Sequence, residues 1–290
     1  MCQSGNCNRM FHVAKMSVDD FPFAVQLANT MDWNMAVEDF EFAAELEPDG
    51  CFVLFCGSER VGIATSVSFG RVGWFGNLVV KEAYRRRGAG ALLVQSAVKY
   101  LKSTGAETIG LYAYPHLIGF YKRFGFKIDV DYLVLQGKAT SPLTEDAAQL
   151  QKVKKQVSPA IIDFDSQCFG ACRKKLLEPI LRDPDNLCYI AVDDREIAGY
   201  CAATVYEEMA GVGPLMCRRN SSGVAVALLQ TVLGKLKNHD VFICVPTKET
   251  TLLEVLFKTG LREKFRVTRM FLGNAAAKGC TYIAESLERG

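Results

Sequence analysis

Three arginines and two glycines stand close together between Arg85 and Gly90, and the apolar run ALLV follows them directly. The residue pattern from there to Gly105 predicts a helix, so this basic stretch would lie at the helix N-terminus. Helix N-termini bind phosphate through unpaired amides, and glycines allow a phosphate to approach the backbone closely. A solvated basic loop and a tight connection with incidental charges are the alternatives. Turn geometry alone would explain Gly88 but not Gly90, which favours the phosphate site.

A second stretch that could do chemistry is acidic. The segment from Asp32 to Asp49 contains no lysine or arginine, and between its ends it carries five carboxylates: Glu38, Asp39, Glu41, Glu45 and Glu47. Carboxylates gathered in this way would attract a cationic amine. The alternative is the solvated acidic face of a helix.

Cysteines are numerous, but their spacing does not predict a metal site. The chain has eleven cysteines and three histidines. Cys168 and Cys172 would share a helix face, and Cys51 and Cys56 bracket an apolar run, yet neither pair has a second pair at zinc spacing. We therefore expect reduced thiols and no bound metal.

Composition narrows the class of protein. A length of 290 residues suits two domains, and the formal net charge of +2 gives no reason to expect a nucleic-acid partner. The sequence has no apolar run as long as a membrane span, and the N-terminal residues lack the apolar stretch of a secretory signal. We expect a cytoplasmic protein without a membrane partner, and the sequence leaves open whether it forms a homodimer.

The order of predicted elements repeats. In the first half, Ser17 is predicted to cap an amphipathic helix, and residues 51–70 predict a hairpin around Gly57 and Ser58. A strand, the helix after the arginines, another strand and a short helix follow. Residues 187–208 begin the same series again, and Ala91 to Gly125 spans nearly the same length as Ala227 to Gly260. We therefore predict two copies of one domain, at residues 1–138 and 159–290, joined by a polar linker at residues 139–158.

The first half resembles the GNAT superfamily of N-acetyltransferases over residues 11–138. The stretch RRRGAG, Arg85–Gly90, is similar to the family signature Arg/Gln-x-x-Gly-x-Gly/Ala between a strand and a helix, and FYKRFGF, Phe120–Phe126, is similar to its Tyr-x-x-x-Gly-Phe block. The resemblance implies an α/β fold of the α+β type, the GNAT acyl-CoA N-acyltransferase fold. In that fold, helices flank a mixed central sheet, and here it would occur in two tandem copies.

The same resemblance implies an acetyl-CoA site. The amides of residues 86–91 would hold the pyrophosphate, and the strand before them would pair with the pantetheine arm through Leu78 and Val80. A bulge at Gly76–Asn77 would open a gap for the cofactor. The implied cofactor-binding residues are Leu78, Val79, Val80, Arg85, Arg86, Arg87, Gly88, Ala89, Gly90, Ala91 and Tyr121.

The resemblance also implies roles in the reaction. Tyr121 would protonate the leaving thiolate, and the amide of Leu78 would polarise the thioester carbonyl. Glu38 and Asp39 are the candidates for binding or deprotonating the amine. Trp33 and Tyr112 would either line the acceptor site or belong to the core. Many relatives have asparagine where this chain has Tyr114, so the acceptor residues of better-known relatives do not transfer directly.

The second copy departs from the pattern. When the two ALL runs are aligned, Val224 and Val226 replace the signature glycines. When Gly125 is aligned with Gly260, Leu256 replaces Tyr121. We therefore expect a GNAT-like domain without acetyl transfer and one coenzyme A per chain, although Gly223 would allow a shifted phosphate loop. The predicted function is transfer of acetyl from acetyl-CoA to a primary amine, with a non-catalytic acetyl-CoA sensor as the alternative.

Overall fold

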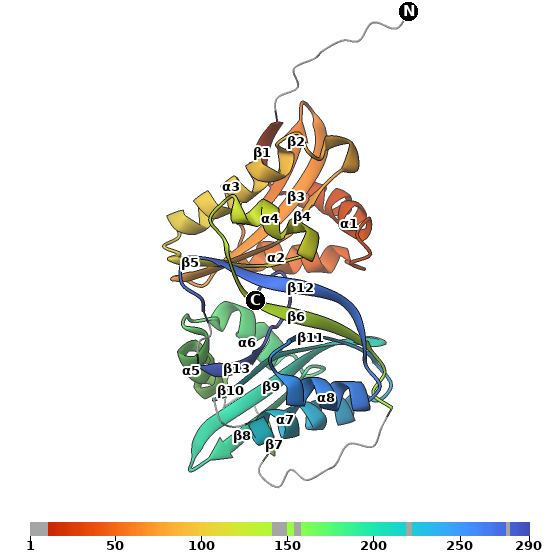
Figure 1. Ribbon diagram of the computed structural model, residues 1–290, viewed down its shortest axis with the longest axis vertical. Coiled ribbons are helices and arrows are strands. Elements are labelled where there is room, and N and C mark those ends of the chain that lie inside the picture. Colours follow the sequence, from red (N-terminus) through yellow and green to blue (C-terminus); the bar gives the residue numbers. More distant parts are fainter. Residues whose placement is uncertain (1–10, 141–149, 154–157, 219–221, 277–278) are drawn as a thin grey trace, which may run out of the picture. The chain divides into compact units, whose positions relative to one another are not determined.

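The computed structural model describes residues 11–140, 150–153, 158–218, 222–276 and 279–290 (Figure 1). The chain forms two compact units. Unit 1 is built from the residues up to Ser68 and from Gly73–Ala106, and unit 2 from Phe69–Val72 and Glu107–Gly290. Most of the predicted linker at residues 139–158 lies outside the described residues.

Unit 1 is an antiparallel sheet with helices on both faces. Its strands pair in chain order: β1 (Phe11–Lys15), β2 (Cys51–Cys56), β3 (Glu59–Ser68) and β4 (Val72–Val80). The predicted hairpin around Gly57 and Ser58 is thereby confirmed. The helices are α1 (Phe21–Asn29), α2 (Val37–Leu46) and α3 (Ala89–Ser103).

The two faces of this sheet have different partners. Ile63 and Val79 share a core cluster with buried residues of α1 and α2. A Cβ atom added at Gly62 would lie 3.2 Å from Leu93 of α3, so α3 packs on the opposite face. The predicted cap of the first helix is present, because the Asp20 carboxylate accepts hydrogen bonds from the amide and hydroxyl of Ser17 at 2.8 and 2.7 Å.

Unit 2 contains the remaining elements. Its strands are β5 (Thr108–Ala113), β6 (Lys127–Gly137), β7 (Leu150–Lys152), β8 (Leu187–Asp193), β9 (Glu196–Tyr206), β10 (Met209–Arg218), β11 (Asp240–Pro246), β12 (Arg262–Leu272) and β13 (Cys280–Ile283). Its helices are α4 (Ile118–Lys122), α5 (Ser158–Phe169), α6 (Lys174–Arg182), α7 (Ser222–Lys235) and α8 (Thr250–Lys258). The strand order is β5-β12-β6-β11-β10-β9-β8-β7, and β13 pairs with β10.

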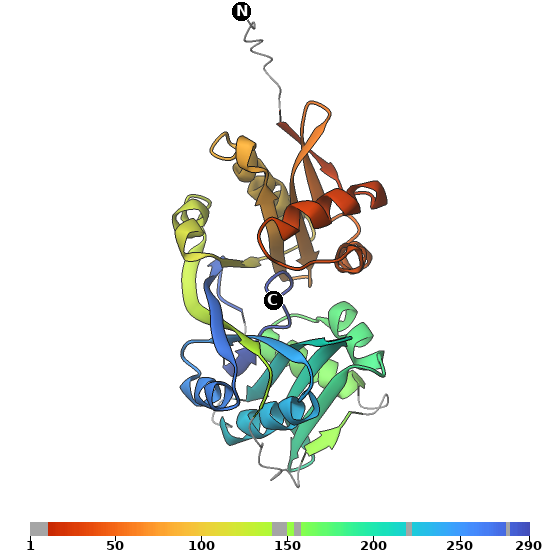
Figure 2. The same ribbon diagram turned by 90° about the vertical axis from the view of Figure 1, so that its right-hand side faces the viewer.

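The helices of unit 2 also cover both faces of its sheet. Leu228 of α7 and Leu252 of α8 belong to one core cluster together with Cys201 of β9. The neighbouring residue on β9, Tyr200, points to the other face, where its ring meets Phe164 of α5. Figure 2 shows α7 and α8 together on their side of this sheet.

The described elements repeat in order. The series strand, two helices, three strands, helix, strand, helix, strand runs from β1 to β6 and again from β7 to β12. The last strands of the two series exchange partners, because β12 lies between β5 and β6 and β6 lies against β11. The mixed α+β fold with two tandem copies is confirmed, and the domain boundaries at residues 138 and 159 stay a prediction.

The described residues contain no membrane-spanning helix, metal cluster or disulfide. No helix among them is long and apolar enough to cross a membrane. No group of three or more histidine, cysteine, aspartate or glutamate side chains in the described part of the chain is arranged to hold a metal. The nine described cysteines are free thiols, and seven of them are buried.

Candidate active site

The basic turn has the backbone shape that a phosphate site needs. Gly88 is the N-cap of α3 and has φ of 88°, a left-handed conformation that favours glycine. Nothing lies within 4 Å of the place where a Cβ atom of Gly88 would stand, so the space there is open. The Leu92 amide donates to the Gly88 carbonyl at 3.1 Å, and the helix amides before it, those of Ala89, Gly90 and Ala91, remain for an outside acceptor.

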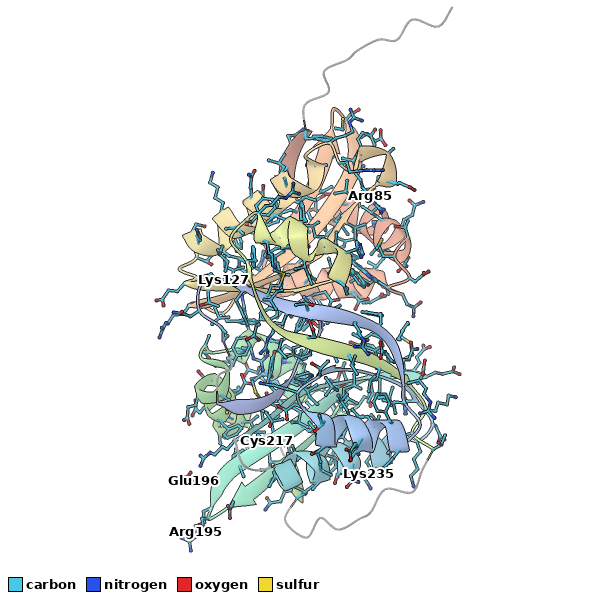
Figure 3. All side chains as sticks on the ribbon, viewed as in Figure 1. Arg85, Lys127, Arg195, Glu196, Cys217 and Lys235 are labelled. Atoms are coloured by element: carbon cyan, nitrogen blue, oxygen red, sulfur yellow. The ribbon has the colours of Figure 1, made fainter. Side chains whose placement is uncertain are left out.

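The three arginines of this turn have different surroundings. Arg85 (Figure 3) donates from Nε to the Val80 carbonyl at 2.9 Å, and its Nη2 lies 3.9 Å from the Met31 sulfur. Arg85 therefore ties the turn to the end of β4. The guanidinium of Arg87 lies 5.6 Å from the centre of the Tyr84 ring. Arg86 is exposed and has φ of 59°.

Tyr84 connects this turn to the start of β3. Its hydroxyl donates to the Glu59 carboxylate at 2.6 Å, and the same carboxylate is 3.1 Å from the Lys81 ammonium. The hydrogen bond to Glu59 therefore fixes the Tyr84 ring, against which the Arg87 guanidinium packs. Sequence reasoning missed this support, because the two partners are 25 residues apart.

Strand β4 carries the expected bulge, one residue later than predicted. In its pairing with β3, Ile63 faces Val79 and Thr65 faces Gly76, so Asn77 and Leu78 together oppose Ala64 alone. Asn77 has φ of 50°, a left-handed conformation that asparagine tolerates better than most residues. The bulge therefore falls at Asn77–Leu78.

Asn77 is itself a polar side chain of interest. It is 5% exposed, and its Nδ2 donates to the Thr65 hydroxyl at 3.2 Å. Its Oδ1 is buried and has no hydrogen-bond donor among the described residues. Thr65 follows Ile63 by two positions, so Asn77 lies on the sheet face that α1 and α2 cover. The Gly76–Asn77 pair within an apolar strand indicated a bulge in the sequence, but it did not indicate a role for the Asn77 side chain.

The acidic helix lies on this same face. Asp39 accepts a hydrogen bond from the Ala36 amide at 2.8 Å and so caps the N-terminus of α2. Glu38 is exposed. Trp33 is half-buried against the core formed by α1 and α2.

Tyr121 lies on α4 in unit 2. It is 5% exposed, and its ring centre is 5.1 Å from that of Phe120 and 6.1 Å from that of Phe126. Burial raises the pKa of its hydroxyl, so the hydroxyl keeps its proton at neutral pH. Tyr112 meets Tyr132 edge-on at 5.0 Å in the core of unit 2, and Tyr114 stacks on His116.

Two family models match the chain. A model described as the acetyltransferase (GNAT) family matches residues 15–126, and one described as an acetyltransferase (GNAT) domain matches residues 161–282. Together the two matches span most of the 290 residues. The chain belongs to the GNAT family. It is a tandem member, which confirms the resemblance seen in its first half and the prediction of a second copy.

Solved structures share this GNAT fold. A candidate acetyltransferase from Pyrococcus horikoshii superposes with a TM-score of 0.79 at 21% identity, over 100% of this chain and 99% of that one. A GNAT N-acetyltransferase from Sphaerobacter thermophilus gives 0.67 at 17% identity, over 93% and 98%. A tandem GNAT protein from the clavulanic acid biosynthesis pathway gives 0.60 at 13% identity, over 92% and 100%. No curated protein matches the chain. Family and fold together support an acyl-CoA N-acyltransferase.

The second GNAT copy has apolar groups where the first has its candidate chemistry. Val224 and Val226 pack against the core of unit 2, and Leu256, in place of Tyr121, is fully buried in that core. Residues 219–221, just before α7, lie outside the described residues, so the shifted loop considered for Gly223 stays a prediction.

Proposed function

We propose that this GNAT protein moves the acetyl group of acetyl-CoA to a primary amine of a small molecule or a protein. The amine attacks the thioester carbonyl directly while both substrates are bound. The observation that carries the proposal is the left-handed turn at Gly88, which begins α3, the next α-helix after the bulged strand β4. The first copy, residues 1–138, would carry the reaction in the cytoplasm, and residues 159–290 would form a non-catalytic copy.

The residues of unit 1 fit coenzyme A. The amides from Arg86 to Ala91 would bind the pyrophosphate at the positive end of α3. Arg85 is already hydrogen-bonded to the Val80 carbonyl. We therefore assign the phosphate contacts to Arg86 and to Arg87, whose guanidinium packs on the Tyr84 ring. Backbone groups of Leu78, Val79 and Val80 would pair with the pantetheine amides as an added strand does.

The proposed reaction assigns each proton. The neutral amine forms a C–N bond to the acetyl carbon, and the amide of Leu78 stabilises the oxyanion. The C–S bond then breaks, Tyr121 gives its proton to the departing thiolate, and the nitrogen loses its extra proton to solvent or to a carboxylate. Solvent returns a proton to Tyr121 before the next turnover. Glu38 and Asp39 remain the proposed carboxylates, with Glu38 the better placed because Asp39 caps α2.

Thiol release from acetyl-CoA with a panel of primary amines tests the function. We expect amine-dependent release from the wild type and a loss of coenzyme A affinity of about 10- to 100-fold in Gly90→Val, which places a side chain among the phosphate-binding amides. The second copy already has valine at this position and still forms its helix, so the fold should survive. Micromolar binding without release from any amine would favour the alternative sensor. Absence of coenzyme A binding would contradict both functions.

We further propose that Asn77 binds the acceptor amine. An unpaired buried acceptor costs on the order of 1–3 kcal/mol, and an N–H of the neutral amine would remove that cost at Oδ1. Asn77 lies on the sheet face that α1 and the acidic helix α2 cover. Because the carboxylates of α2 would attract an amine, this position favours the amine over the pantetheine as the partner of Asn77.

Asn77→Gly tests this role without straining the backbone, because φ is 50° at this position. We expect kcat/KM for the amine to fall by about 10-fold or more, with the KM for acetyl-CoA changed less than about 2-fold. Thr65→Val is the matched control, because it removes the partner of Nδ2 and leaves Oδ1 in place. Equal losses for both substrates would show that the side chain serves only the strand.

A further inference from the structure

Strand β10 in the second copy has the same bulge as β4 in the first. Cys201 faces Leu215 and Ala203 faces Val212, so Gly213 and Pro214 together oppose Ala202 alone. The first copy has Asn77 and Leu78 at this place, 136 positions earlier. The same offset relates Ala91 to Ala227 in the following helix, so the two bulges are equivalent.

The edge of β10 changes partner at its bulge. Before it, Met209–Val212 pair with β11 in parallel. After it, Leu215–Arg218 pair with β13 in antiparallel register, from Leu215 opposite Ile283 to Arg218 opposite Cys280. Strand β13 also contacts β11, so it fills the space that opens between β10 and β11 (Figure 1).

The equivalent edge in the first copy is the proposed pantetheine site. Leu215 and Met216 correspond to Val79 and Val80 at the shared offset. We infer that β13 occupies, in the second copy, the place that the pantetheine arm takes in the first. The chain's own residues 280–283 thereby close the second copy to acyl-CoA. This inference rests on the proposed function, which supplies the role of the first copy's edge.

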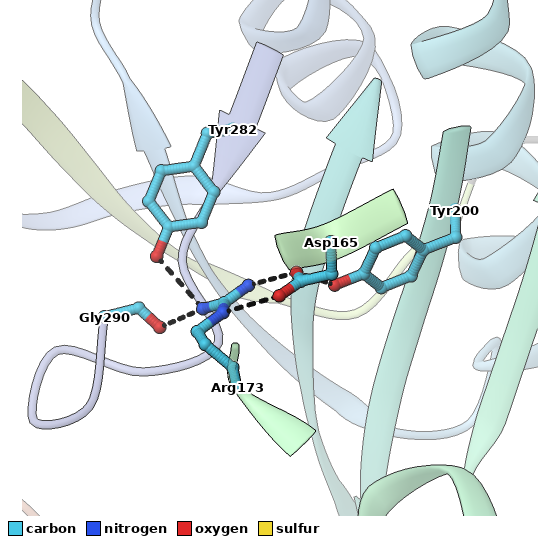
Figure 4. Close-up of polar contacts among 5 residues, drawn as sticks. All are labelled: Asp165, Arg173, Tyr200, Tyr282 and Gly290. Carbon is cyan, nitrogen blue, oxygen red and sulfur yellow. Dashed lines mark hydrogen bonds and ion pairs between the residues drawn. The ribbon is translucent and has the colours of Figure 1, made fainter. Parts of the chain in front are cut away.

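Close contacts hold β13 in this position. A Cβ atom added at Gly213 would lie 2.0 Å from the carbonyl oxygen of Ala284, the residue directly after β13, so the backbone at the end of the strand passes close to a glycine. The fully buried Arg173 donates from Nη1 to the Tyr282 hydroxyl at 3.5 Å and to the Gly290 carbonyl at 2.9 Å (Figure 4). The guanidinium also lies 5.6 Å from the centre of the Tyr282 ring.

The edge of β10 after its bulge is suited to an extended peptide and not to pantetheine, because β13 already pairs with it. An extended peptide satisfies the backbone groups of β10 with main-chain hydrogen bonds, as an added strand does. Pantetheine offers amides at fewer positions, and here it would have to displace a strand that a buried guanidinium anchors. Val224 and Val226, which pack in the core, take the place of the glycines that would receive the phosphates.

Calorimetry and hydrogen exchange on the full chain test the inference. We expect one coenzyme A per wild-type chain, and slow exchange of the residue 280–283 amides that coenzyme A does not change. Gly213→Ala should displace β13 and speed this exchange by at least about 100-fold. Gly211→Ala on the same strand is the control, because nothing lies within 4 Å of its added Cβ atom.

The outcomes separate the inference from the proposed function. Two tight coenzyme A sites per chain, or faster exchange of residues 280–283 on adding coenzyme A, would overturn the inference alone. Unchanged exchange in Gly213→Ala would also overturn it. No coenzyme A binding by the wild type would contradict the proposed function and, with it, the equivalence of the two edges.

Discussion

Tyr121→Phe is expected to lower kcat by about 10²- to 10⁴-fold, the contribution typical of a positioned general acid. The thiolate leaving acetyl-CoA needs a proton, and phenylalanine has none to give. Because Tyr121 is 5% exposed and burial raises its hydroxyl pKa, the wild-type residue remains protonated above the pH at which an exposed tyrosine loses its proton. Turnover should therefore show no fall at high pH that titrates Tyr121.

Two measurements complete this test. Coenzyme A affinity, measured by calorimetry, should change less than about 2-fold, because the substitution removes one hydroxyl and keeps the ring packed between Phe120 and Phe126. Tyr114→Phe is the matched control, since it removes a hydroxyl from a ring that stacks on His116 and has no proposed role. Equal turnover in wild type and Tyr121→Phe would remove Tyr121 from the mechanism.

The parts of the fold that were predicted from sequence depend on neighbours in the chain. The cap at Ser17, the hairpin at Gly57 and the helix after Gly88 each follow from residues within a few positions of one another. The bulge was predicted one residue early because glycine suggested it, whereas Asn77 takes the left-handed conformation.

The exchange of strands could not be predicted in this way. Strand β12 pairs with β5 through Thr268 opposite Ala113, across 155 positions of the chain, and no local pattern identifies that partner. Strand β6 has a continuous buried run, Tyr132–Leu135, which does not by itself select β5 or β11 as the neighbour. Burial alone therefore leaves the choice open, and long-range packing decides it.

In the candidate site, too, features set by neighbouring residues could be predicted, and contacts between distant residues could not. Residues 85–91 were selected from their spacing, and the left-handed turn at Gly88 follows from the same local pattern, while the phosphate site itself stays a prediction. The support of Arg87 by Tyr84 and Glu59, and the unpaired Oδ1 of Asn77, depend on contacts between separate strands. Roles that depend on such contacts do not follow from the sequence, because residue type alone does not separate a hydrogen-bonded asparagine oxygen from an unpaired one.

Arg173→Met is expected to lower the free energy of unfolding of unit 2 by about 3–5 kcal/mol, the cost of breaking a buried ion pair from one side. Nη2 and Nε of Arg173 contact the Asp165 carboxylate at 2.6 and 3.0 Å, and both side chains are fully buried (Figure 4). Burial by itself lowers the pKa of Arg173, but the Asp165 carboxylate outweighs it and holds that pKa well above its usual value. In the variant, the buried Asp165 carboxylate would lose the guanidinium and keep the hydrogen bond from the Tyr200 hydroxyl at 2.5 Å.

Scanning calorimetry can separate this effect from a simple loss of charge. A drop of 3–5 kcal/mol corresponds to a fall in melting temperature on the order of 10 °C for a unit of this size. Arg266→Met is the matched control, because it breaks an exposed pair with Glu263 and should leave the melting temperature nearly unchanged. Adding Asp165→Asn to Arg173→Met should recover part of the loss, since it removes the stranded charge. If the double variant melted no higher than Arg173→Met, the stability would come from the contacts of the guanidinium with Tyr282 and Gly290. Holding β13 in place would then be the main role of Arg173.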